Sequence, residues 1–172
     1  PELTSPAWIT AGLQTAGKGR RSRPWVSPRG NFHGTLVLKP TEAPEVVALR
    51  SFVAALALRD ALAALTGLPA SLTLKWPNDV LLNGGKLAGI LLESQGLGQD
   101  DAVLCIGIGV NLIAAPDVSL IEPGALPAVS LLAETGLRVT PGALLDALDR
   151  AKAAREATFR SERCAPIRDT WL

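Results

Sequence analysis

Residues 75–93 read KWPNDVLLNGGKLAGILLE, and this stretch predicts the centre of the fold. Two apolar runs, 80–82 and 87–92, flank Asn83-Gly84. This pair favours the tight two-residue turn of a β-hairpin, because both turn positions need a positive φ. Gly85, beside the turn, predicts a bulge in the pairing of the two strands.

The same stretch carries an unusual group of polar side chains. Residues 75–79 combine a cation, an aromatic ring, an amide and a carboxylate, and Lys86 follows just past the turn. Polar groups gathered on so apolar a sheet indicate a functional site. The alternative interpretation is a buried ion pair between a lysine and Asp79, since ion-pair networks also occur in clefts.

Upstream, residues 7–14 alternate as a strand does, and residues 15–31, TAGKGRRSRPWVSPRGN, predict a long loop. We call residues 15–31 the basic loop. No acidic residue occurs from 3 to 41, whereas this span holds Lys18, Arg20, Arg21, Arg23, Arg29 and Lys39. Glycines among cations favour binding of a phosphate or carboxylate, with Trp25 as a flat apolar surface. A solvated basic loop, or one that contacts RNA, is equally compatible with the charge alone.

The rest of the chain alternates apolar strands and helices. Strands are expected at 32–38, 72–75 and 103–111, and helices from 44 to a stop at 67, at 130–134, and from 141 past 155. A loop is expected at 114–127. The mixed charges of the last helix predict a solvated face.

Two features of these strands bear on function. Gly107 and Gly109 share a strand face, which lets a ligand approach closely or a helix pack closely, and Asn111 follows them. His33, the only histidine, is expected to be an ordinary residue at a strand edge. With no nucleophile motif beside it, it supports neither a catalytic triad nor a zinc site.

Composition bounds the class of protein. The 172 residues predict one domain, the hydrophobic fraction of 48% excludes a disordered chain, and the net charge of +1 argues against general nucleic-acid binding. Cys105 and Cys164 lack metal-ligand spacing and are expected to be free thiols in a reducing compartment. The apolar run at 52–65 is broken by charges and is too short to span a bilayer.

Three motifs, in order and spacing, resemble the catalytic domain of biotin protein ligases: QTAGKGRRSRPWVSP, KWPNDVLLNGGKLAGIL and GIGVN. The resemblance implies an α+β fold, a mixed sheet backed by helices, related to class II aminoacyl-tRNA synthetases. It implies that residues 1–172 are that catalytic domain, with a Ser-Thr-Asn biotin motif expected upstream and a small domain expected after Leu172. No helix-turn-helix segment is present to support a repressor role.

The resemblance also implies the reaction: biotin is activated by ATP as biotinyl-5′-AMP, with Mg²⁺, and passes to a lysine of a biotin carboxyl carrier protein in the cytoplasm. Catalysis would fall to Lys86, Arg20 and Asp79. The biotin contacts would be Gln14, Gly17, Lys18, Gly19, Arg20, Lys86, Gly89, Gly107 and Gly109. The ATP and phosphate contacts would be Arg20, Arg21, Arg23, Trp25, Lys75, Asn78, Lys86 and Asn111. Spacing gives no metal ligands, and Mg²⁺ would accompany ATP near Asp79.

Two departures from the family pattern stand in the basic loop. Lys18 stands where the family usually has arginine, so the forked donors of a guanidinium are missing there. Ser22 stands where the family usually has glycine, so the local backbone conformation is expected to differ. Two alternatives stay open: a lipoate or octanoate ligase or transferase on a related fold, and a non-catalytic relative that binds biotin and nucleotide. Whether the protein forms a homodimer also stays open. No membrane partner is expected.

Overall fold

The computed structural model describes residues 5–117, 119 and 124–162, so Cys164 lies outside the described residues. Six strands form one sheet in the order β1-β2-β6-β5-β4-β3. They are β1 (Ala7–Thr10), β2 (Phe32–Leu38), β3 (Leu72–Lys75), β4 (Asp79–Leu82), β5 (Gly85–Gln95) and β6 (Val103–Val110). The helices are α1 (Pro44–Ala48), α2 (Arg50–Thr66), α3 (Leu131–Thr135) and α4 (Pro141–Glu162).

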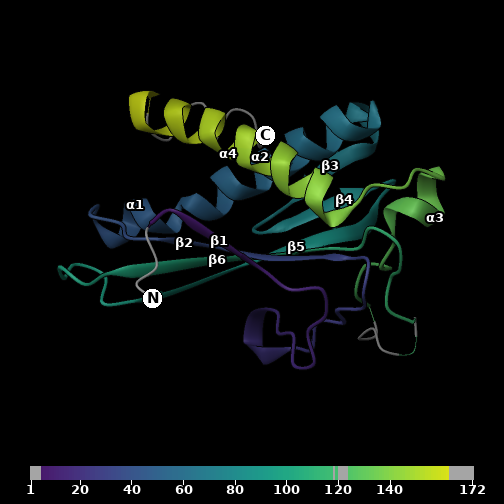
Figure 1. Cartoon of the computed structure of the whole chain (residues 1–172), viewed down its shortest axis with the longest axis horizontal. Helices are drawn as coiled ribbons and strands as arrows, with labels where there is room; N and C mark the ends of the chain where they lie inside the picture. Colours follow the sequence, from purple (N-terminus) through teal and green to yellow (C-terminus); the bar gives the residue numbers. More distant parts are fainter. Residues whose placement is uncertain (1–4, 118, 120–123, 163–172) are drawn as a thin grey trace.

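The expected α+β class, a sheet backed by helices, is confirmed. Helices α2 and α4 cover one face of the sheet, and the basic loop lies beyond the opposite face (Figure 1). All neighbouring strands pair antiparallel, although a mixed sheet was expected. A parallel contact occurs as the isolated bridge between Lys86 and Ala128.

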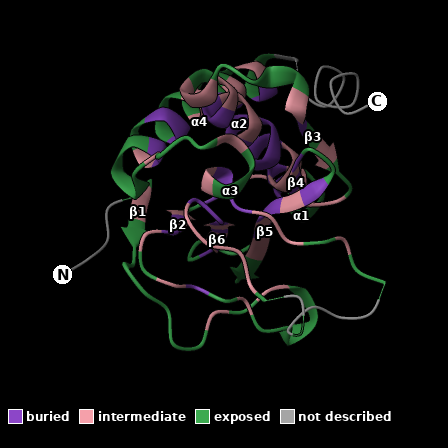
Figure 2. Ribbon diagram, turned by 90° about the vertical axis from the view of Figure 1, so that its right-hand side faces the viewer, coloured by how far each residue is buried: buried purple, intermediate pink, exposed green. Residues whose placement is uncertain are grey.

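The core lies between the sheet and the two long helices, where the buried residues concentrate (Figure 2). Leu58 and Leu62 of α2 and Leu144 and Leu148 of α4 are fully buried there. Their burial follows from the nearly continuous apolar composition of α2 and from the apolar positions of α4, which recur at helical spacing. The opposite face of the sheet is left for a site.

Two predicted elements differ in extent from the structure. The strand expected at 7–14 ends at Thr10, because Gln14 turns away to pair with Ser27 in the basic loop. The single helix expected from residue 44 is two helices, broken at Leu49, with Gly67 at the end in the left-handed conformation. The break lets Arg50 begin α2 with its side chain turned inward.

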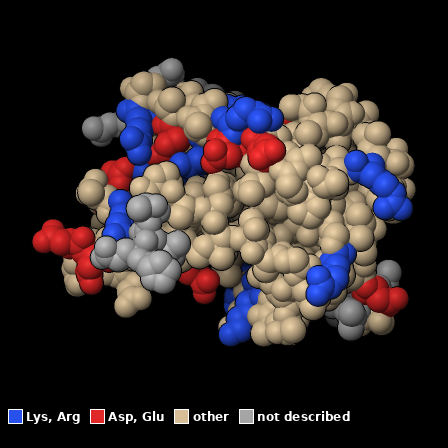
Figure 3. All heavy atoms as spheres, in the orientation of Figure 1, with Lys and Arg blue, Asp and Glu red and all other residues tan. Residues whose placement is uncertain are grey.

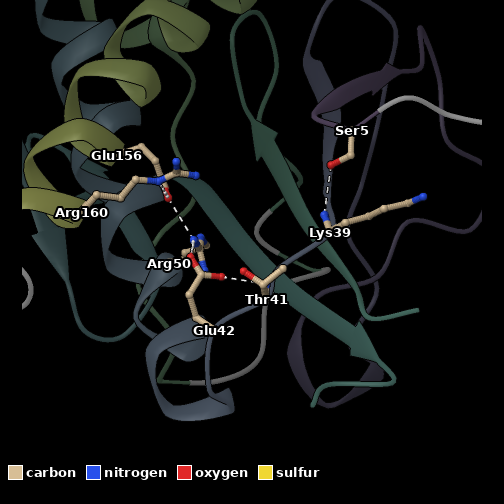
Figure 4. Close-up of polar contacts among 7 residues, drawn as sticks. All are labelled: Ser5, Lys39, Thr41, Glu42, Arg50, Glu156 and Arg160. Atoms are coloured by element: carbon tan, nitrogen blue, oxygen red, sulfur yellow. Dashed lines mark hydrogen bonds and ion pairs between the residues drawn. The ribbon is translucent and has the colours of Figure 1, made fainter. Parts of the chain in front are cut away.

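The solvated face predicted for the charges of α4 is correct in part: Arg150 and Arg160 are exposed, whereas Glu156 is buried. Arg50 of α2 is 4% exposed and lies 2.6 Å from Glu42 and 3.0 Å from the buried Glu156 of α4 (Figure 4). Arg155 of α4 pairs with Asp60 of α2 at 2.6 Å. Figure 3 shows charges of both signs side by side over this helical layer. Helix–helix ion pairs therefore supplement apolar packing.

Strand β5 is longer than its neighbour β4. Its pairing with β4 ends at Gly89, whereas its pairing with β6 continues to Gln95. Residues 91–95 thus form an open edge as far as the described strands go. Within residues 5–117, 119 and 124–162, no helix is long and apolar enough to cross a membrane.

Candidate active site

The β4–β5 hairpin has the predicted turn and bulge. Asn83 and Gly84 have φ of 51° and 82°, the left-handed values that a tight hairpin turn needs. The register shifts between Val80 and Leu81, as a bulge requires. The shift changes the alternation of β5, so Lys86 and Gly89, three apart, share a face: a Cβ on Gly89 would lie 3.6 Å from Lys86 Cε.

Lys86 and Asp79 form the ion pair that the sequence left as an alternative to a functional site. Lys86 Nζ lies 2.9 Å from Asp79 Oδ1, and the two side chains are 32% and 18% exposed. The pair is therefore not fully buried. It lies on the wall of a cleft, so an ion pair and a site coincide here.

Asn78 ties the KWPND turn to the basic loop. Its side-chain amide donates to the Ile90 carbonyl, and its Oδ1 accepts from Arg20 Nη1 at 3.4 Å. The side chain of Arg20 is otherwise exposed, within the short 3₁₀ helix Arg20–Ser22. The contact places an arginine from one predicted motif beside the central hairpin of another.

The basic loop is folded rather than structureless. Isolated bridges join Gln14 to Ser27 and Lys18 to Pro24, and Ser27 Oγ donates to Gln14 Oε1 at 2.7 Å. The departure at Ser22 has a local consequence, because its φ is 58°. A left-handed residue other than glycine costs about 1–2 kcal/mol, which explains why glycine is favoured at this position.

Trp25 lies on the glycine face of the sheet. A Cβ on Gly109 would overlap the Trp25 indole, and one on Gly89 would lie 3.3 Å from Cζ3. The strands pair Gly89 with Gly109, so the two glycines form one flat platform. Lys86 Nζ lies 5.6 Å from the centre of the indole ring. The close approach predicted at Gly109 is thus made, in this structure, by the chain's own tryptophan.

A single cleft of about 1010 Å³ brings the predicted site residues together. All sixteen lie along it: Gln14, Gly17, Lys18, Gly19, Arg20, Arg21, Arg23, Trp25, Lys75, Asn78, Asp79, Lys86, Gly89, Gly107, Gly109 and Asn111. Six of these are basic, and the acidic residues lining the cleft are Asp79 and Glu93. The excess of cations suits anionic ligands.

Three residues differ from expectation or were missed. His33 is buried in an inner strand rather than at an edge, with Nε2 3.1 Å from the Pro28 carbonyl oxygen. Trp76 lines the cleft and is 72% exposed. Asn31 is buried and bonded to a distant segment, and its place between Gly30 and an apolar strand was the signal that could have found it.

The chain belongs to the biotin/lipoate A/B protein ligase family, whose model matches residues 1–111. This confirms the family predicted from the three motifs.

Within the family the similarity is to biotin ligases. The chain is 54% identical over 172 residues to the biotin–[acetyl-CoA-carboxylase] ligase of Paracoccus denitrificans, covering 100% of the chain and 72% of that protein. It is 32% identical over 172 residues to the bifunctional ligase/repressor BirA of Escherichia coli strain K12, and spans 52% of that protein's length.

Solved structures agree with this assignment. The biotin protein ligase from Leishmania major in complex with biotinyl-5-AMP matches with a TM-score of 0.77 and 27% identity, over 95% of this chain and 68% of that one. The enzyme from Aquifex aeolicus in complex with biotin and ATP matches with a TM-score of 0.78 and 25% identity, over 99% and 68%.

Proposed function

We propose that this chain, as a biotin protein ligase, activates biotin with ATP to biotinyl-5′-AMP and transfers the biotinyl group to a lysine of a biotin carboxyl carrier protein. The observation that carries the proposal is the cleft, which gathers all sixteen predicted residues from three separate motifs. Both substrates are anionic where they react, so a cleft rich in cations holds them together at the least electrostatic cost.

In the first half-reaction, an oxygen of the biotin carboxylate forms a bond to the α-phosphorus of ATP. The bond from that phosphorus to the bridging oxygen breaks, and pyrophosphate leaves with the electron pair. Lys86 stands between the carboxylate and the α-phosphate and offsets their repulsion, which grows as charge develops. Arg20, beside Asn78, adds a second cation from the loop.

The remaining roles divide along the cleft. Gln14, just before the basic loop, and Gly17, Lys18 and Gly19 within it contact biotin, and the sheet glycines form the floor beneath it. The phosphates are held by Arg21, Arg23 and Lys75, and the nucleotide is bounded by Trp25, Asn78 and Asn111. Each of these side chains or backbones already faces the cleft.

In the second half-reaction, the amine of the acceptor lysine forms a bond to the acyl carbon of the adenylate. The bond from that carbon to the phosphate oxygen breaks, AMP leaves, and the amine gives up a proton. We assign the acceptance of this proton to Asp79, the carboxylate that pairs with Lys86. No protein nucleophile is needed, which agrees with the absence of a triad motif in the sequence.

Magnesium fits this site as a companion of ATP rather than as a resident ion. Among the described residues, no group of three His, Cys, Asp or Glu side chains could hold a metal. Mg²⁺ is commonly bound by substrate phosphates with one or two carboxylates, which Asp79 can supply. When bound, it would neutralise charge on the phosphates.

The proposal extends to the setting of the reaction. Residues 1–172 act as the catalytic domain, the protein works in the cytoplasm, and its macromolecular partner is the carrier domain of a carboxylase. The free thiol of Cys105 in β6 is compatible with a reducing compartment.

The test is to incubate the purified chain with ATP and one acid at a time, and to measure AMP formation and labelling of a carrier domain. Biotin should drive both, whereas lipoate and octanoate should not. A preparation that prefers lipoate or octanoate would overturn the proposed substrate. One that binds biotin and ATP without releasing pyrophosphate would instead identify a non-catalytic relative.

A further inference from the structure

Asn31, the last residue of the basic loop, makes an unusually complete set of hydrogen bonds. It is 1% exposed. Its Oδ1 accepts from the backbone N–H groups of Ile113 at 2.9 Å and Ala114 at 3.1 Å. Its Nδ2 donates to the Ala114 carbonyl at 2.7 Å and to Asn111 Oδ1 at 3.4 Å. Both donors and both acceptor positions of the amide are therefore used.

The neighbouring residue packs against the same distant segment. Gly30 has a φ of 89°, and a Cβ there would overlap the side chain of Ile113. The end of the basic loop is thus held against residues 113–114 by close packing as well as by hydrogen bonds. Asn111 and Pro116, on either side of this pair in the sequence, line the cleft. We call residues 111–117 the cleft wall.

Asn111 extends the connection to the backbone of Lys86. Its Nδ2 donates to the Val129 carbonyl at 3.1 Å. The N–H of Val129 in turn donates to the Lys86 carbonyl at 3.0 Å, and the N–H of Lys86 donates to the Pro127 carbonyl at 2.8 Å. The two buried asparagines therefore link three elements: the basic loop, the cleft wall and the strand that carries Lys86.

We propose that Asn31 is a positioning residue that fixes the end of the basic loop to the cleft wall, so that the two segments hold the adenylate as one unit. This inference rests on the proposed function. If the end of the basic loop came away from the cleft wall, the cleft would open to solvent there, and the mixed anhydride would leave or meet water before the acceptor lysine arrived. Asn31 touches no reacting atom, so its effect acts through the segments it joins.

The test uses two variants. Asn31→Ala removes both halves of the amide. Asn31→Asp keeps an oxygen for the N–H groups of Ile113 and Ala114 but loses the two donated bonds, so it decides the question if the alanine variant does not fold. Val53→Ala is the control, because it shortens a buried side chain between α2 and α4, far from the cleft, and lowers the melting temperature by packing alone.

Two quantities are measured after adding biotin and ATP: the ratio of biotinyl-AMP released into solution to biotin transferred to the carrier, and amide hydrogen exchange. In the wild type, exchange should slow in both the basic loop and the cleft wall. In the Asn31 variants, it should slow in the basic loop alone, and the release ratio should rise about tenfold, the effect of losing buried hydrogen bonds. Val53→Ala should keep the wild-type pattern.

The outcomes separate the inference from the function. If the wild type forms no biotinyl-AMP, the proposed function fails, and the positioning role fails with it. If the wild type is active but the Asn31 variants release no more adenylate than Val53→Ala, or still protect the cleft wall, only the positioning role is overturned and Asn31 is a purely structural residue.

Discussion

Lys86 has two partners within the chain, the Asp79 carboxylate at 2.9 Å and the face of Trp25. Under the proposed function, the substrate anions would compete with Asp79 for the Lys86 ammonium. Removing a single preorganised cation typically lowers a rate by about 100- to 1,000-fold. We expect Lys86→Ala to slow biotinyl-AMP formation by about this factor, whereas Lys86→Arg should recover only part because guanidinium is planar and bulkier.

The rate must be measured per folded molecule, together with the melting temperature. Lys39→Ala is the matched control, because Lys39 is an exposed lysine that follows β2, a strand that pairs with neither β4 nor β5, and it does not line the cleft. A partly exposed ion pair contributes little stability, so both variants should melt near the wild type. A sharp fall in melting temperature with an unchanged rate would show that Lys86 serves only to pair with Asp79.

Arg20 is exposed and has one long contact to Asn78, so its loss should cost little stability. The proposed role is to hold the activated phosphate inside the cleft. We expect Arg20→Gly to melt close to the wild type but to release biotinyl-AMP, seen as labelling of lysines on a bystander protein such as albumin. A variant that melts several degrees lower and labels only the carrier domain would contradict this role.

At the scale of elements, the basic loop combines glycines, serine and arginines with few backbone bonds to the rest of the fold. Its concentrated positive charge raises its free energy until an anion arrives. We expect amide exchange in residues 17–28 to slow on adding biotin and ATP, while exchange in the α2 core stays unchanged. Equal exchange in residues 17–28 with and without saturating ligand would refute this expectation.

The elements also show what the sequence could and could not predict. Local rules found the hairpin and its bulge, because turn residues and apolar runs act over a few positions, but they extended β1 to residue 14, beyond its end at Thr10. They missed the break at Leu49, because apolar composition continues through it and because the carboxylates that pair with Arg50, Glu42 before α1 and Glu156 in α4, lie outside α2. They missed Asn31 for the same reason: its partners lie some eighty residues further along the chain.

The cleft itself was predicted better through the resemblance than through spacing. The residues alone left anion binding and a solvated basic loop equally open. Neither the residues alone nor the resemblance predicted that Trp25 lies on the Gly89–Gly109 platform. The position of the indole depends on how a long loop folds back across the sheet.

At the scale of the whole molecule, Arg50 connects the start of α2 to two other parts of the chain. It pairs with Glu42, which precedes α1, and with Glu156 in α4. The hydrogen bond from Arg50 holds the pKa of Glu42 below its ordinary value of 4.5. Burial alone lowers the pKa of Arg50, but Glu42 and Glu156 more than offset this, so its pKa is raised and it stays charged. A carboxylate with a lowered pKa stabilises the fold above its unfolded pKa, and this stabilisation is lost as pH falls through the folded value.

We therefore expect Glu42→Gln to lower the free energy of unfolding near neutral pH, with the difference from wild type shrinking as pH falls below about 4.5. Denaturant unfolding at a series of pH values measures this. Glu45→Gln, an exposed neighbour in α1, is the control and should show little difference at any pH. A Glu42→Gln difference that stays constant into acid would exclude the linkage.

The unequal lengths of β4 and β5 have a consequence for how molecules behave in concentrated solution. An open strand edge can recruit a strand from another copy and so begin aggregation. Here residues 91–95 carry Glu93, whose charge repels an approaching copy, followed by exposed polar residues. Glu93→Val should raise light scattering at high protein concentration, and added salt should bring the wild type toward it by screening. Glu93→Asp should scatter like the wild type. If it scatters like the valine variant, the charge of residue 93 is not what prevents this edge from pairing with another copy.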